Sequence, residues 1–145
     1  MRRTAWVVAG LCFAAASALA CQPRATKVGG GDDLPEDQWS RGVFLYGQSC
    51  AGCHGDNGEG DEETPAIAGD GALSSSAAEG SERQATFDTA ADVFAYVKSD
   101  MPPLAPGSLS DDEYWAIVHY VLKQAQIDLG VDTLGADNAA SIKLR

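Results

Sequence analysis

The chain has 145 residues and a formal net charge of −11, from 10 Lys or Arg and 21 Asp or Glu residues. This length fits one domain with flanking segments, and 45% hydrophobic residues are enough to form a core. The negative charge excludes a nucleic-acid-binding protein, which needs a basic face to neutralise phosphates. It also disfavours docking on anionic lipid by charge alone.

The first segment, residues 1–20, has the features of an export signal. Arg2 and Arg3 precede an uncharged stretch from Ala5 to Ala20, which ends in Ala18-Leu19-Ala20. Small residues at this point are typical of a cleavage site, and the stretch is shorter than the roughly 20 residues of a spanning helix. We therefore expect an exported protein, with an uncleaved N-terminal anchor as the alternative.

Cys21 follows the predicted cleavage point directly. Small residues followed by cysteine resemble the signal of bacterial lipoproteins, although Ala18 stands where leucine is usual. The resemblance implies a diacylglyceryl thioether on Cys21, which would anchor the protein on the periplasmic side of a bacterial membrane. Ordinary cleavage that leaves a free thiol is the alternative. Residues 21–38 contain Gly29-Gly30-Gly31 and have the composition of a flexible tether.

Three helices are predicted after the tether, and no alternating strand pattern is present. They extend from Trp39 to about Cys50, from Thr89 to Ser99, and from Asp111 to about Gln126. Thr89-x-x-Asp92 predicts the start of the second helix, and Ser110 with Glu113 forms a capping box before the third.

These elements predict one all-α domain over residues 39–126, with about three main helices and long loops. Residues 71–84 are rich in Gly, Ser and Ala, and form either an insertion or a short helix. Residues 127–145 are weakly patterned and are expected to form a C-terminal tail.

The chemistry is concentrated at residues 50–54, which read Cys50-Ala51-Gly52-Cys53-His54. C-x-x-C-H is the signature for covalent attachment of haem. Two thiols one helical turn apart reach the two vinyl groups on one side of a porphyrin, and the histidine that follows supplies a ligand to the iron.

Paired cysteines in proteins also form redox-active dithiols and bind zinc. A thioredoxin-like dithiol pair requires a βαβ context, which the helical pattern does not provide. A structural zinc site requires four ligands, and the other candidates, Cys21 and His119, are badly placed in the sequence. The motif therefore favours one covalently bound haem c, held by Cys50, Cys53 and His54.

Met101 is the predicted second axial ligand, because Met1 leaves with the signal and no other methionine is present. Pro102 and Pro103 follow it, and a proline restricts the preceding residue to extended conformations. A methionine on such a stiff strap can keep a weak Fe–S bond. His119 is the competing ligand, and its position within the third predicted helix indicates a packed or exposed histidine instead.

Over about residues 39–126 the chain resembles class I c-type cytochromes, with C-x-x-C-H near the start and a Met-Pro strap later. The resemblance implies a small cytochrome c fold in which Gly42 and Tyr46 of the first helix pack against Ile117 and Tyr120 of the last. It also implies that the carbonyl of Pro65 accepts a hydrogen bond from His54 and so fixes the imidazole.

The expected function is one-electron transfer by a His/Met-ligated haem in a tethered carrier of a respiratory chain, and not catalysis. Within residues 39–126, four basic residues face fourteen acidic ones, so redox partners with a basic or neutral docking patch are expected. The alternative is a haem-based sensor or ligand-binding enzyme in which Met101 leaves the iron. A dithiol oxidoreductase that uses Cys50 and Cys53 is a second alternative.

Overall fold

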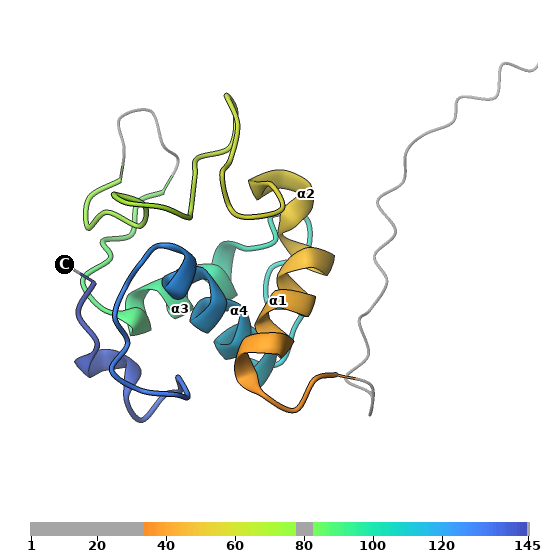
Figure 1. The fold of residues 1–145 in the computed structure, drawn as a ribbon. Coiled ribbons are helices and arrows are strands. Elements are labelled where there is room, and N and C mark those ends of the chain that lie inside the picture. The colour runs from red at the N-terminus through yellow and green to blue at the C-terminus, as the bar shows by residue number, and fades with distance from the viewer. Residues whose placement is uncertain (1–33, 78–82, 145) are drawn as a thin grey trace, which may run out of the picture.

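A computed structural model describes residues 34–77 and 83–144 (Figure 1). The predicted signal peptide, Cys21 and most of the tether lie outside the described residues. The elements in chain order are α1 (Gln38–Ser49), α2 (Ala51–His54), α3 (Ala90–Asp100), α4 (Asp111–Gln124) and the short 3-10 helix η1 (Ala139–Ser141). The described residues contain no extended strand, only an isolated bridge between Thr89 and Lys143. The all-α prediction is therefore confirmed.

Helix α4 forms the centre of the fold, with α1 and α3 packed against it (Figure 1). Ten of its fourteen residues are buried. One buried cluster lies between α4 and α1 and includes Leu45, Tyr46 and Ile117. A second cluster lies between α4, α3 and the segment after α4. A helix enclosed on several sides in this way is apolar around most of its circumference.

The helix starts follow from their N-cap residues. Thr89 accepts from the N–H of Asp92, whose carboxylate in turn accepts from the N–H of Thr89, so α3 begins with a complete capping box. Ser110 and Glu113 form the same reciprocal arrangement at α4. Each box satisfies main-chain donors that have no partner within the helix. Both starts agree with the positions predicted from the sequence.

Helices α1 and α4 cross closely at Gly42. A β-carbon placed on Gly42 would lie 2.2 Å from the carbonyl oxygen of Ala116 and 2.9 Å from the β-carbon of Tyr120. Beside this point the rings of Tyr46 and Tyr120 lie 4.9 Å apart between centroids. The contact expected from the family resemblance is therefore present, with Ile117 buried in the same cluster.

The segment after α4 packs against the core, which its weak sequence pattern did not indicate. The buried side chains are those of Ile127, Leu129, Leu134, Ala139, Ile142 and Leu144. The Gln38 side chain also binds the main chain of Leu134 through two hydrogen bonds, each 2.7 Å long. Residues 127–144 therefore complete the hydrophobic core instead of extending freely from it.

The described ends of the 71–84 segment form an irregular loop. The guanidinium of Arg83 donates to the carbonyl oxygens of Ser74, Ser75 and Ala85. It also lies 4.0 Å above the ring centroid of Phe87, which anchors the loop on the core by a cation–π contact. Within residues 34–77 and 83–144, no helix combines the length and the apolar character needed to cross a bilayer.

Candidate haem-attachment site

Cys50, Cys53 and His54 lie together on one helical turn. Cys50 ends α1, and its carbonyl oxygen accepts from the N–H groups of Cys53 at 3.1 Å and His54 at 3.0 Å. Residues three positions apart along a helical turn are neighbours, so the turn brings the two cysteines close together. The turn therefore arranges two thiols and an imidazole as attachment to a single porphyrin requires.

The two thiols have different surroundings. Both cysteines are free, and Cys50 is half-buried whereas Cys53 is exposed. Burial, and secondarily the charge of Cys53, raises the pKa of the Cys50 thiol to about 12. A reactive dithiol pair depends on a thiol whose pKa is lowered. Burial therefore keeps the Cys50 thiol protonated and makes it a poor nucleophile in the absence of haem.

The imidazole of His54 is held by the loop that follows it. Its Nδ1 lies 3.3 Å from the carbonyl oxygen of Pro65, as the family resemblance implied. With the proton on Nδ1, that nitrogen donates to Pro65 and Nε2 keeps its lone pair for a metal. The loop is closed by hydrogen bonds from Gly60 N–H to the His54 carbonyl and from Asp61 N–H to the Thr64 carbonyl, both 2.8 Å.

Tyr46 also supports this turn, in a role that the sequence did not reveal. Its hydroxyl donates to the carbonyl of Gly55, the residue after His54, at 2.8 Å. The Tyr46 side chain is 2% exposed and belongs to the α1–α4 contact. The packing of the two helices is therefore connected directly to the main chain beside His54. An aromatic residue alone gives no sequence signal for where its hydroxyl will bind.

The loop after His54 is strongly acidic. Residues 56–63 carry the carboxylates of Asp56, Glu59, Asp61, Glu62 and Glu63. The main-chain N–H groups of Thr64 and Glu63 donate to Asp61 and lower its pKa. The surface next to the attachment turn is consequently negative at neutral pH.

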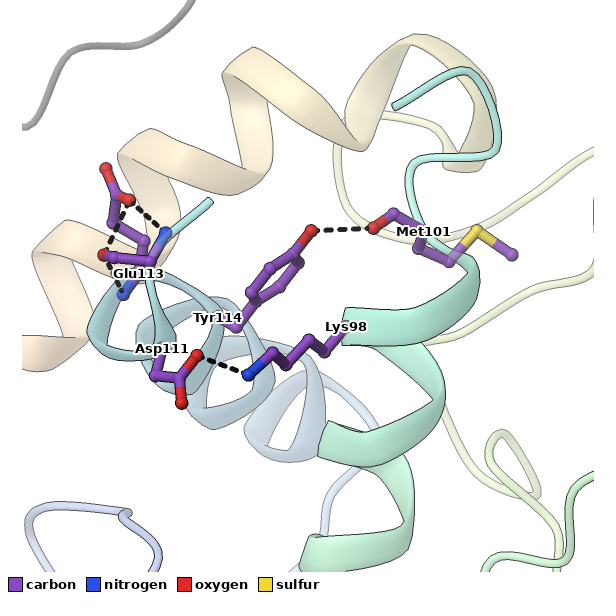
Figure 2. A network of polar contacts seen from close by, with 6 residues as sticks. Lys98, Met101, Asp111, Glu113 and Tyr114 are labelled. Carbon is purple, nitrogen blue, oxygen red and sulfur yellow. Dashed lines mark hydrogen bonds and ion pairs between the residues drawn. The ribbon is translucent and has the colours of Figure 1, made fainter. Parts of the chain in front are cut away.

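Met101 lies on a separate segment, at the C-terminal end of α3. Its N–H donates to the carbonyl of Val97 at 3.0 Å, and its backbone is extended (φ −121°, ψ 144°), as the following proline predicted. The Met101–Pro102 peptide bond is cis. The hydroxyl of Tyr114 donates to the Met101 carbonyl at 3.1 Å (Figure 2).

His119 is packed inside the molecule. It is 2% exposed on α4, next to the ring of Trp39 at 6.3 Å between centroids. Among the described residues neither ring nitrogen has a hydrogen-bond partner. Burial, and secondarily the positive charge of Lys123, lowers the pKa of this imidazole. His119 is therefore a neutral core residue.

A helical domain with this attachment turn defines a c-type haem protein. The family model for cytochrome c matches residues 39–125, and the chain belongs to that family. Sulfane dehydrogenase SoxCD from Paracoccus pantotrophus is a similar solved structure, with 24% sequence identity and a TM-score of 0.49. The match covers 70% of this chain and 53% of that chain, so this chain corresponds to about half of it. No curated protein matches the chain.

The residues present fit the haem c that the cytochrome c family binds covalently. Two free cysteines on one helical turn are available for thioether bonds. The adjacent imidazole has one nitrogen occupied by Pro65 and the other available. Family membership also assigns the general function, which is electron transfer by haem.

Proposed function

We propose that this chain is a one-electron carrier, and not an enzyme, in which His54 and Met101 are the two axial ligands of the haem iron. The observation that carries the proposal is the orientation of His54 by the carbonyl of Pro65, at 3.3 Å. An imidazole fixed in this way is a stronger and better-directed donor than a free one. Met101, held in an extended segment at the end of α3, is the candidate for the second ligand.

The protein residues have distinct tasks in this proposal. Cys50 and Cys53 would hold the haem through two thioether bonds, which would prevent loss of the cofactor. Pro65 orients the imidazole through Nδ1, and the Met101 sulfur would be the second protein ligand of the haem iron. When bound, the haem supplies an iron that accepts and returns one electron. Two protein ligands leave no open position for a substrate, and a His/Met pair raises the reduction potential.

The negative surface beside the attachment turn supports a docking partner with a basic or neutral patch. Residues 56–63 follow His54 directly and carry five carboxylates. Opposite charges accelerate association, and this acceleration decreases as salt screens the charges. We therefore expect the rate of electron exchange with a basic redox partner to fall as the ionic strength rises.

The proposed location is the periplasmic side of a bacterial membrane, with a lipid on Cys21 as the anchor. A tethered carrier of this kind would move electrons between a quinol-oxidising complex and a terminal reductase or oxidase. The Cys21→Ser variant should appear in the soluble periplasmic fraction, whereas the unchanged protein should remain with membranes. Membrane retention of the variant would refute the lipid anchor without affecting the proposal for the haem ligands.

The ligand proposal is tested by optical spectroscopy of the full-length holoprotein. Met–Fe(III) ligation gives a near-infrared charge-transfer band, which should be present in the unchanged protein and absent from Met101→Ala. The variant should also have a lower reduction potential. An unchanged band and potential would remove Met101 from the site. Rapid carbon monoxide binding by the ferrous unchanged protein, without denaturant, would favour a ligand-binding sensor or enzyme.

A further inference from the structure

The segment that carries Met101 is attached to the centre of the fold by a buried tyrosine. Tyr114 of α4 is 1% exposed, and its hydroxyl donates to the main-chain carbonyl of Met101 at 3.1 Å. Figure 2 shows the methionine side chain extending away from Tyr114, on the far side of the strap. The contact therefore fixes the main chain of Met101 and leaves its sulfur free for another partner.

Both main-chain polar groups of Met101 are engaged, each by a different helix. The N–H donates to Val97 of α3 at 3.0 Å, and the carbonyl accepts from Tyr114 of α4. The next residue, Pro102, has no N–H and cannot make the hydrogen bond that would extend α3. The position of Met101 relative to the core thus depends on α3 from one side and on the Tyr114 hydroxyl from the other.

Tyr114 can serve as a fixed point because its own position is firmly determined. It directly follows the capping box, in which the Glu113 carboxylate accepts from the Ser110 N–H and hydroxyl, both at 2.7 Å. Its N–H also donates to the Ser110 carbonyl at 3.0 Å. The tyrosine ring is buried in the helix that both α1 and α3 contact. Movement of Tyr114 would therefore require movement of the central helix.

A second connection between α3 and α4 is weaker. Lys98 and Asp111 form an ion pair with 2.6 Å between Nζ and Oδ1 (Figure 2), but their side chains are 43% and 62% exposed. Exposed ion pairs contribute little, and salt screens them. The hydrogen bond from Tyr114 to Met101 is neutral and part-buried, so salt weakens it less, and it is consequently the stronger of the two connections between α4 and the end of α3.

We propose that Tyr114 is a positioning residue for the Met101 ligand. Its hydroxyl keeps the strap against α4 and so slows departure of the methionine sulfur from the iron. The inference rests on the proposed ligation by Met101 and adds the group that controls how readily an external ligand replaces this methionine.

The test compares imidazole binding to ferric holoprotein in the unchanged protein, Tyr114→Phe and Tyr120→Phe. At saturating imidazole the observed rate is the rate of methionine dissociation. Tyr114→Phe should increase this limiting rate about fivefold, the factor that corresponds to one ordinary hydrogen bond. Tyr120 lies on the same helix and is also buried, and its hydroxyl accepts from Gln124 instead of binding the strap. Tyr120→Phe should remain within about twofold of the unchanged protein.

Each outcome separates this inference from the ligand proposal. If the near-infrared band is present but Tyr114→Phe stays within about twofold, the positioning role is refuted and Met101 ligation stands. If the unchanged protein has no such band, Met101 ligation fails and the inference fails with it.

Salt provides a second measurement that does not depend on the folding of Tyr114→Phe. The limiting rate of the unchanged protein should vary by less than about twofold between low salt and about 1 M salt. An increase of about fivefold or more would show that the ion pair between Lys98 and Asp111 keeps Met101 in place, and it would overturn the inference.

Discussion

Replacing Gly42 by alanine should destabilise the folded protein, although alanine is the better helix former. The new β-carbon would lie 2.2 Å from the Ala116 carbonyl oxygen and 2.9 Å from the Tyr120 β-carbon. The first of these atoms is main chain, so no side-chain rotation can relieve the contact. Helices α1 and α4 would have to separate locally by about 1 Å to restore an ordinary contact distance.

The magnitude follows from two opposing contributions. Extra volume in a packed contact lowers the free energy of unfolding by about 1–3 kcal/mol. Exchange of glycine for alanine within a helix raises it by about 1 kcal/mol. Because the new β-carbon would clash with main-chain atoms of Ala116, which cannot rotate away, the packing cost should lie at the upper end of this range. We expect a net loss of about 2 kcal/mol in the free energy of unfolding, or roughly 10 °C in Tm.

Gly47→Ala is the matched control on the same helix. A β-carbon placed on Gly47 has no neighbouring atom within 4 Å. The substitution therefore acts only through the higher helix propensity of alanine, and it should raise the free energy of unfolding by about 0.5–1 kcal/mol. Guanidinium unfolding of the three holoproteins measures both changes. Equal effects of the two substitutions, or a Gly42→Ala variant as stable as the unchanged protein, would refute the close-crossing argument.

Two further predictions concern stability. His119→Leu should remove a pH dependence of the free energy of unfolding. Burial lowers the pKa of His119 in the folded protein. As the pH falls below 6.5, the ordinary pKa of histidine, the unfolded chain therefore takes up a proton that the folded chain does not. The free energy of unfolding of the unchanged protein should therefore decrease by up to about 1.4 kcal/mol per pH unit, and equal slopes in both proteins between about pH 6.5 and 5 would contradict this. Leu134→Ala, at a position 1% exposed, should cost about 2–5 kcal/mol in guanidinium unfolding. Leu104→Ala, at a position 82% exposed, is its control and should change stability by less than about 0.5 kcal/mol, and similar effects of the two would show that residues 127–144 do not contribute to the core.

Local signals in the sequence predicted the helices well. Thr89 with Asp92 and Ser110 with Glu113 are capping pairs that act over three residues, so their spacing is visible without any knowledge of the fold. The attachment turn was equally accessible, because C-x-x-C-H is contiguous. The close crossing at Gly42 required the family resemblance, since a glycine alone indicates only a weakened helix.

Contacts between distant parts of the chain were not predictable in the same way. Gln38 and Leu134 are joined by two hydrogen bonds although 96 positions separate them. The buried residues after α4 follow neither a period of 3.6 nor a period of 2, because no regular element other than η1 supports them. The role of Tyr114 depends likewise on where the strap passes α4, which only the folded structure gives.

The orientation of α1 has a practical consequence for handling the protein. The helix has 12 residues and is therefore about 18 Å long, with the chain entering at Gln38 and the two thiols located at the opposite end. An affinity tag, a fluorescent fusion or a surface linker added before Gln38 would thus project from the end remote from Cys53. Immobilisation on an electrode through that end should leave the attachment turn facing solution.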